Sequence, residues 1–158
     1  MLERAPGQAV LGRPAVPVDL EHTPGVMLMR MTGTISPSQA AEQSGFSLDT
    51  LRYYERIGLL NGISRAPSGH RRFGDDDLEW LSVLRCLRDT GMPIARMRRY
   101  AELARDGEPT LAERLRLLTE HDAQVSERIA LLQAQRKHLR GKIDWYRSQL
   151  EPAASPTG

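Results

Sequence analysis

The carboxyl-terminal third of the 158-residue chain carries a regular pattern of apolar residues. From Leu111 onward the pattern advances in alternating steps of four and three residues, which is the spacing of a coiled-coil seam. The seam consists of Leu111, Leu115, Leu118, Asp122, Val125, Ile129, Leu132, Arg136, Leu139, Ile143 and Tyr146. A helix of this length extends roughly 60 Å, which is more than a domain this small can cover. The pattern predicts a coiled-coil helix over residues 108–151, begun by a capping box of Thr110 and Glu113, that pairs with a second copy of the chain.

Two positions of the seam are charged. Asp122 and Arg136 lie seven residues on either side of Ile129. In a parallel homodimer each charge faces its own copy and repels it, whereas in an antiparallel homodimer centred on Ile129 each Asp122 approaches the partner's Arg136. The sequence therefore favours antiparallel pairing. The alternative is that the two helices splay apart at both charged positions.

A helix-turn-helix pattern stands in the first half of the chain. Ser36 and Gln39 form a capping box that predicts the start of a first helix. Gly45 permits a turn, Ser47 caps a second helix, and Gly58 stops it. The spacing predicts two short helices joined by a tight turn.

A hairpin and a pair of helices are expected next. The segment Ala66-Pro-Ser-Gly69 fits a tight turn, and short strands on either side of it would form a wing. The three acids that begin at Asp75 favour a helix amino terminus, and Gly91 ends that helix. Pro93 then opens another helix that runs to about residue 104.

The order of these elements and two motifs resemble the MerR family of bacterial transcription regulators. The motifs are TLRYYERIGLL at residues 50–60 and SGHRRF at residues 68–73. The resemblance implies a mainly α fold, with a winged helix-turn-helix DNA-binding domain and helix pair over residues 34–107 and a long antiparallel coiled-coil dimerisation helix after it. It also implies a homodimer on double-stranded promoter DNA. Such a dimer switches transcription by distorting the promoter spacer in response to an effector, and it reaches RNA polymerase only through the promoter.

Positive charge is concentrated in the segment that carries these motifs. Five arginines and two acidic residues lie between Ser47 and Arg72, a local net charge of +3, although the whole chain carries only +2. The resemblance assigns DNA contacts to Ser47, Thr50, Arg52, Tyr53, Tyr54, Arg65, His70, Arg71 and Arg72. Two interpretations of Tyr54 stay open, a hydroxyl contact to phosphate and core packing beside Leu51. The family more often has an aromatic residue where His70 stands, so the packing of the wing stays open.

Cys86 is the one cysteine of the chain, which excludes an intrachain disulfide. Its surroundings resemble the branch of the family that senses aldehydes or other electrophiles through a single cysteine, and the charges of Arg85 and Arg88 would favour a reactive thiolate. The alternative, which the sequence favours, is a small core residue on an apolar helix face. One cysteine and four scattered histidines cannot build the thiolate metal site of the metal-sensing members, so neither a metal nor another cofactor is expected.

Other classes of function find less support in the sequence. No catalytic motif is present, so we expect no enzyme. A DNA-binding architectural or excision-type protein without a sensor, and a coiled-coil adaptor, stay open as alternatives. The absence of a run of ~18 apolar residues predicts a cytoplasmic protein without a membrane span. The Pro- and Gly-rich residues 1–33 predict a flexible arm, and residues 152–158 a disordered tail.

Overall fold

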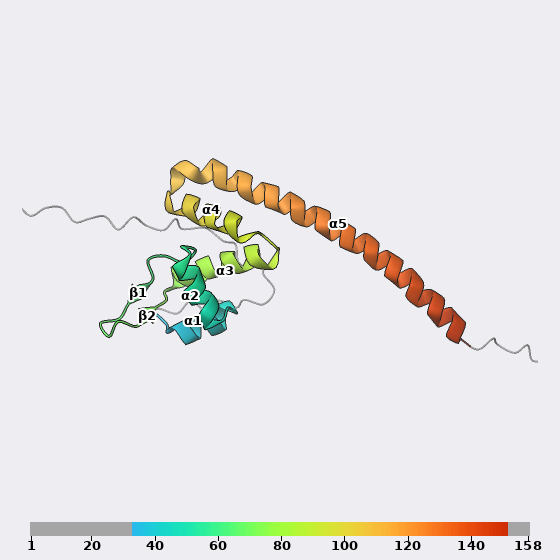
Figure 1. The fold of residues 1–158 in the computed structure, drawn as a ribbon, viewed down its shortest axis with the longest axis horizontal. Helices are drawn as coiled ribbons and strands as arrows, with labels where there is room; N and C mark the ends of the chain where they lie inside the picture. The colour runs from blue at the N-terminus through green and yellow to red at the C-terminus, as the bar shows by residue number, and fades with distance from the viewer. Residues whose placement is uncertain (1–32, 152–158) are drawn as a thin grey trace, which may run out of the picture. The chain divides into compact units, whose positions relative to one another are not determined.

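The computed structural model describes residues 33–151, so the predicted tail and all but the last residue of the predicted arm lie outside the described part. Helices dominate, as predicted (Figure 1). The elements are α1 (Pro37–Ser44), α2 (Leu48–Arg56), β1 (Ser64–Arg65), β2 (Arg71–Arg72), α3 (Asp75–Asp89), α4 (Ile94–Arg105), a short 3₁₀ helix (Glu108–Thr110) and α5 (Leu111–Leu150). The chain divides into two compact units between Arg116 and Leu117. The predicted domain boundary at residue 107 stays a prediction.

The first two helices form the expected helix-turn-helix. The Ser36 hydroxyl accepts a hydrogen bond from the Gln39 amide at 3.3 Å, and the Gln39 side chain accepts one from the Ser36 amide at 3.0 Å. This reciprocal pair is the predicted capping box. Gly45 adopts a left-handed conformation with φ of 69°, which turns the chain into α2. Helix α1 packs against both α2 and α3.

The wing is a two-stranded antiparallel hairpin. Ser64 pairs with Arg72 and Arg65 with Arg71. The Gly69 amide donates to the Ala66 carbonyl at 2.8 Å, which closes the predicted turn. At the base of the hairpin, Phe73 forms an isolated bridge with residue 35, ahead of α1. The wing is therefore tied to the start of the helix-turn-helix.

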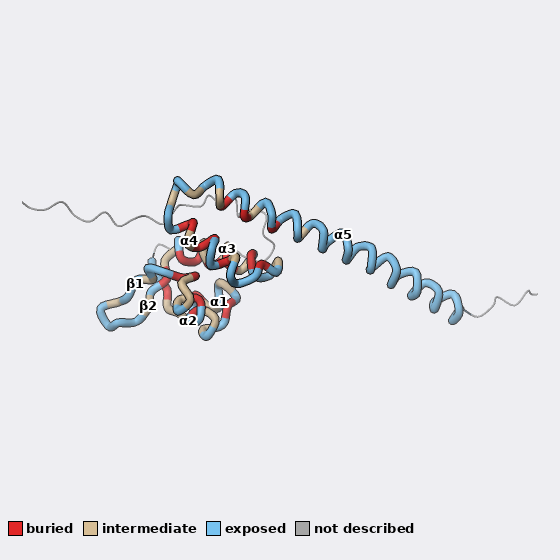
Figure 2. Tube along the Cα trace, turned by 45° about the horizontal axis from the view of Figure 1, so that its top comes forward, coloured by how far each residue is buried: buried red, intermediate tan, exposed pale blue. Residues whose placement is uncertain are grey.

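The hydrophobic core gathers among the short helices, and Figure 2 marks buried residues along α3 and α4. Its largest fully buried side chains are Leu59, Leu60, Leu81, Leu84, Met97 and Leu103. The Trp80 indole stacks on Tyr100 with ring centroids 5.8 Å apart and donates to the Leu59 carbonyl at 2.8 Å. Arg105 donates to the Gly58 carbonyl at 2.8 Å. Side chains of α3 and α4 thus hold the link between α2 and the wing.

The start of α5 differs from the predicted capping box. The Thr110 hydroxyl donates to the carbonyls of Leu103 at 2.6 Å and Gly107 at 2.8 Å, so it acts as a donor where a cap must accept. The Glu113 carboxylate forms an ion pair with Arg99 at 2.7 Å. Both side chains of the expected box are therefore bonded to α4 or to the turn after it, and not to each other's backbone.

Candidate nucleic-acid interface

Helix α2 presents a polar, partly cationic face to solvent. The Ser47 hydroxyl accepts from the Thr50 amide at 3.0 Å and lies 2.9 Å from the Thr50 hydroxyl, so one side chain both caps the helix and fixes its neighbour. Arg52 and Tyr53 are exposed. The Arg56 guanidinium lies over the Tyr53 ring at 5.4 Å, which holds this aromatic group at the surface. These side chains supply donors, acceptors and a ring edge on one helix face.

Tyr54 belongs to the core. Its side chain is 3% exposed, and its ring meets Phe46 edge to face with centroids 5.2 Å apart. Burial raises the pKa of Tyr54, and the nearby Arg88 guanidinium offsets part of that increase. Of the two interpretations offered for this residue, the structure supports packing.

The predicted wing residues fall into two groups. Arg65, His70 and Arg72 are exposed, whereas Arg71 is half-buried. The Arg71 Nε lies 2.6 Å from Glu55 Oε2 of α2. The wing therefore offers the solvent-facing guanidinium groups of Arg65 and Arg72, together with Arg71, which is anchored to α2.

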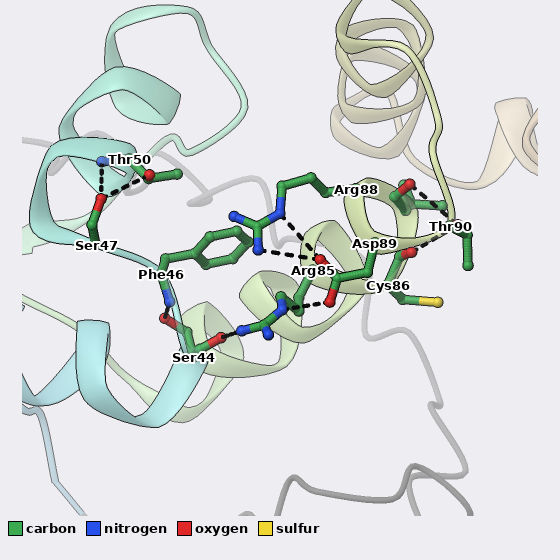
Figure 3. Close-up of polar contacts among 10 residues, drawn as sticks. Ser44, Phe46, Ser47, Thr50, Arg85, Cys86, Arg88, Asp89 and Thr90 are labelled. Carbon is green, nitrogen blue, oxygen red and sulfur yellow. Dashed lines mark hydrogen bonds and ion pairs between the residues drawn. The ribbon is translucent and has the colours of Figure 1, made fainter.

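A second charged cluster joins the last turn of α3 to the turn between α1 and α2 (Figure 3). Asp89 accepts from Arg85 Nε at 2.6 Å and from Arg88 Nη2 at 3.1 Å. These hydrogen bonds, the one from Arg85 foremost, lower the pKa of Asp89. Arg85 also donates to the Ser44 carbonyl at 3.1 Å, and the Arg88 guanidinium lies over the Phe46 ring at 4.6 Å. The cluster thus holds the chain that leads into α2.

Cys86 is exposed, so its interpretation as a core residue is wrong. The core stripe of α3 passes through Leu84 and Leu87, and Cys86, which lies between them, turns outward. In Figure 3 the sulfur points away from Arg85 and Arg88, whose guanidinium groups are held by Asp89. The two expected activating cations are therefore directed elsewhere.

Two further residues of this surface, Glu55 and Arg88, are not indicated by the sequence patterns. Glu55 anchors the wing, and Arg88 lies beside Phe46, directly before the Ser47 cap, with 40% of its side chain exposed. Neither position stands out in the sequence as an interface residue, because Glu55 is an acid within a basic segment and Arg88, two residues after Cys86, suggests a role beside the thiol. Only the packing of α3 on the helix-turn-helix brings Arg88 to this face.

Most of the seam predicted on α5 is exposed in the single chain. Leu118 and Val125 are half-buried, and all other members face solvent. The exposed apolar members include Leu115, Ile129 and Leu139, with 67%, 50% and 59% of each residue exposed. Seven apolar members of the seam are therefore left uncovered along α5, at Leu111, Leu115, Ile129, Leu132, Leu139, Ile143 and Tyr146.

The described residues contain neither a metal-binding cluster nor a helix suited to span a membrane. Between residues 33 and 151, no group of three or more His, Cys, Asp or Glu side chains is placed to hold a metal ion. Within that range, none of the helices combines the length and apolar character that a transmembrane span requires.

Two protein-family models match the chain. The family described as "MerR HTH family regulatory protein" matches residues 35–103, and the one described as "MerR, DNA binding" matches residues 78–142. An HTH-type transcriptional regulator from Haemophilus influenzae is 41% identical over 113 residues, which cover 72% of this chain and 84% of the relative. The HTH-type transcriptional regulator AdhR of Bacillus subtilis is 33% identical over 90 residues, which cover 57% of this chain and 64% of AdhR.

Two solved structures share the fold and much of the sequence. A MerR family transcriptional regulator from Listeria monocytogenes has a TM-score of 0.70 and 42% identity, covering 75% of this chain and 89% of the relative. HiNmlR, described as a MerR family regulator lacking the sensor domain and bound to promoter DNA, has a TM-score of 0.68 and 40% identity. That alignment covers 73% of this chain and 91% of HiNmlR.

Proposed function

Because this chain belongs to the MerR family of transcription regulators, we propose that it binds promoter DNA as a homodimer and switches transcription by distorting the promoter spacer in response to an effector. The observation that carries the proposal is the exposed face of α2 with its flanking wing, on a chain that is 40% identical to a relative bound to promoter DNA. Bending a site of this size costs about 1–6 kcal/mol, which phosphate contacts can supply.

The proposed contacts follow from exposure. Side chains of α2 reach base edges and phosphates, and the cations of the wing hold the adjacent backbone. The contact set is Ser47, Thr50, Arg52, Tyr53, Arg65, His70, Arg71 and Arg72, to which the packing adds Arg88. Tyr54 supports this surface from beneath. Its buried ring positions α2 on Phe46.

The proposed dimer forms along the seam of α5. Its uncovered apolar side chains need a partner surface of the same length, and a second copy supplies one. Charge is distributed unevenly along the helix. Residues 130–150 carry five Lys and Arg against one Asp, whereas residues 111–129 carry three Arg against four acids. Antiparallel pairing brings the basic half of each helix to the acidic half of its partner, which supports that orientation.

The effector proposed is an electrophile that modifies Cys86. The thiol is solvent-exposed, which such chemistry requires. The test is a reporter gene under the protein's own promoter, treated with aldehydes and quinones. The proposal expects induction with the natural chain and none with Cys86→Ser. Unchanged induction of Cys86→Ser would remove the thiol from the mechanism.

A second candidate is a DNA-binding regulator without any sensor. It is favoured by the likeness to HiNmlR, which is described as lacking the sensor domain. The same reporter separates the two candidates, because a protein without a sensor gives constant transcription under every inducer.

Footprinting of the purified protein on the DNA upstream of its own gene, at two salt concentrations, tests the DNA-binding proposal itself. We expect a two-fold symmetric protected site between the polymerase recognition elements, which weakens steeply as salt rises. Absence of specific protection, both there and on duplexes selected from a random library, would contradict the proposal.

A further inference from the structure

Glu55 is an acid within the most basic segment of the chain, and it faces the wing. Its Oε2 lies 2.6 Å from Arg71 Nε, and its Oε1 lies 3.9 Å from Arg65 Nη2. The Glu55 and Arg71 side chains are 28% and 36% exposed, so their short contact is partly shielded from water. One carboxylate of α2 thus contacts an arginine on each strand of the hairpin.

The bridge between Phe73 and residue 35 holds the base of the hairpin, and Glu55 adds an anchor at its strands. Each of its strands is two residues long, and a short isolated two-stranded hairpin is at best marginally stable in water. Inside the hairpin, Arg65 Nη1 donates to the Gly69 carbonyl at 3.0 Å, and the Ser64 hydroxyl donates to the Arg72 carbonyl at 2.9 Å. These hydrogen bonds stabilise the hairpin internally. The ion pairs of Glu55 hold it to α2, across 16 residues of sequence.

The contact with Glu55 also fixes the orientation of the Arg71 guanidinium. Arginine carries five donors in a rigid plane, and Glu55 takes the one on Nε. The Nη groups therefore keep their donors for another acceptor, in a plane that the carboxylate sets. A restrained arginine binds a phosphate in one position relative to α2, whereas a free arginine binds any phosphate within reach.

We propose that Glu55 is a positioning residue: through Arg71 it fixes the wing relative to α2, and it thereby increases the discrimination between operator DNA and other DNA. The inference rests on the proposed DNA-binding function. Glu55 lowers the attraction of this surface for DNA in general, because its negative charge opposes the phosphates. It raises affinity for the matching duplex alone, where the phosphate lies at the place that Arg71 can reach.

The experiment compares Glu55→Gln with Asp49→Asn. Both substitutions remove one negative charge from α2, but Asp49 pairs only within the helix, with Arg52 at 3.2 Å, where the two side chains are 91% and 67% exposed. Dissociation constants are measured for a duplex that the natural protein selects from a random library and for a scrambled duplex. Asp49→Asn should tighten binding to both and leave their ratio unchanged. Glu55→Gln should tighten binding to the scrambled duplex only, so that the ratio falls roughly tenfold.

Two further variants separate position from charge and from folding. Glu55→Asp keeps the charge but withdraws the carboxylate from Arg71, so it should lower the ratio without tightening binding to the scrambled duplex. In an Arg71→Gln background, adding Glu55→Gln should change the ratio by less than about twofold, because the residue through which Glu55 acts is gone. Circular dichroism melting of each variant identifies any loss of fold.

The outcomes separate this inference from the proposed function. If the natural protein selects no duplex, the proposed function and the inference fall together. If it selects one but Glu55→Gln changes the ratio no more than Asp49→Asn does, the inference alone is overturned. The inference is also overturned if Glu55→Gln lowers the ratio of dissociation constants as much in the Arg71→Gln background as it does in the natural protein.

Discussion

Two carboxylates form ion pairs with four arginines of the wing and α3. Glu55 contacts Arg71 and Arg65 of the wing, and Asp89 binds Arg85 and Arg88 of its own helix. Partly exposed ion pairs contribute little stability, about 0–1 kcal/mol each. Their value is orientation, because each one holds the plane of a guanidinium group. Arg65, Arg85 and Arg88 each make a second contact as well, whereas Arg71 keeps its Nη donors for another acceptor.

Gly45 should tolerate substitution less well than other glycines with positive φ. A Cβ at this position would lie 1.9 Å from Arg85 Nη1, whereas a Cβ at Gly62 would meet no atom within 4 Å. Both residues have φ near +69°. We expect Gly62→Ala to lower the free energy of unfolding by about 1 kcal/mol through the backbone alone, and Gly45→Ala to lower it by about 2 kcal/mol or more.

Urea unfolding followed by circular dichroism, at one protein concentration, measures both losses. Equal losses for the two variants would mean that the Arg85 side chain moves away from Ser44 at no cost.

Arg88 should act as a phosphate contact and Arg85 should not. Asp89 binds both arginines, but Arg88 lies closer to the Phe46 ring beside the start of α2, at 4.6 Å against 6.0 Å, whereas Arg85 also donates to the Ser44 carbonyl. Arg88→Gln should therefore reduce the slope of log affinity against log salt by about 0.9 per protomer. Arg85→Gln removes the same charge from the same helix and should leave the slope unchanged. Titration of the selected duplex over a series of KCl concentrations measures both, and a flat response to Arg88→Gln would remove Arg88 from the interface.

The helix starts illustrate how far the sequence predicts the elements. The box of Ser36 and Gln39 forms because both partners are local and nothing else competes for them. The same pattern at Thr110 fails, because the Thr110 hydroxyl bonds to the Leu103 carbonyl and the Glu113 carboxylate pairs with Arg99. The prediction of a core position for Cys86 is wrong for a related reason. Apolar neighbours in the sequence suggest a core position, but the position on the helix decides which side chain turns inward.

The orientation of the α5 pair can be tested by exchanging its two seam charges. In the antiparallel arrangement, Asp122→Arg places like charges opposite each other twice per dimer, and adding Arg136→Asp restores both pairs. We expect the single variant to weaken dimerisation roughly tenfold or more and the double variant to recover it. Sedimentation equilibrium measures the dimer dissociation constants. In a parallel dimer the single variant would only replace one like-charge pair by another, so equal constants for the natural and single-variant proteins would contradict antiparallel pairing.

At the scale of the whole molecule, the helical fold and the helix-turn-helix with its wing were predictable, because capping residues, glycines and apolar spacing are local signals. The interface was predictable only in part. Residues on α2 follow from the motif, but Arg88 reaches the same surface from more than 30 residues away and depends on packing that no local pattern encodes. The ion pairs of Glu55 depend in the same way on how the wing folds back toward α2.

Dimerisation should be required for tight DNA binding. Ile129 is at the centre of the seam and is 50% exposed in the single chain, so Ile129→Asp would place an unpaired charge at the centre of the dimer. We expect dimerisation to weaken by about 3 kcal/mol or more, a factor above one hundred, and the affinity for a two-fold symmetric duplex to fall with it. Ala130→Asp makes the same charge change one position away from the seam and should alter neither. If the monomeric Ile129→Asp variant bound DNA as tightly as the natural protein does, the proposed requirement for a dimer would be contradicted.

The close approach of Arg85 to Gly45 also constrains how sequences of this kind can diverge. While the end of the Arg85 side chain occupies the space beside the turn, a residue that tolerates a left-handed backbone, such as asparagine, enters position 45 only if that guanidinium group moves and gives up its hydrogen bond to the Ser44 carbonyl. Shortening of residue 85 removes that cost beforehand, and it leaves Asp89 with Arg88 as its remaining cation. Substitution at position 85 before position 45 should therefore be the favoured order. Across relatives, side chains larger than glycine at the turn should occur together with small residues at the helix position facing it.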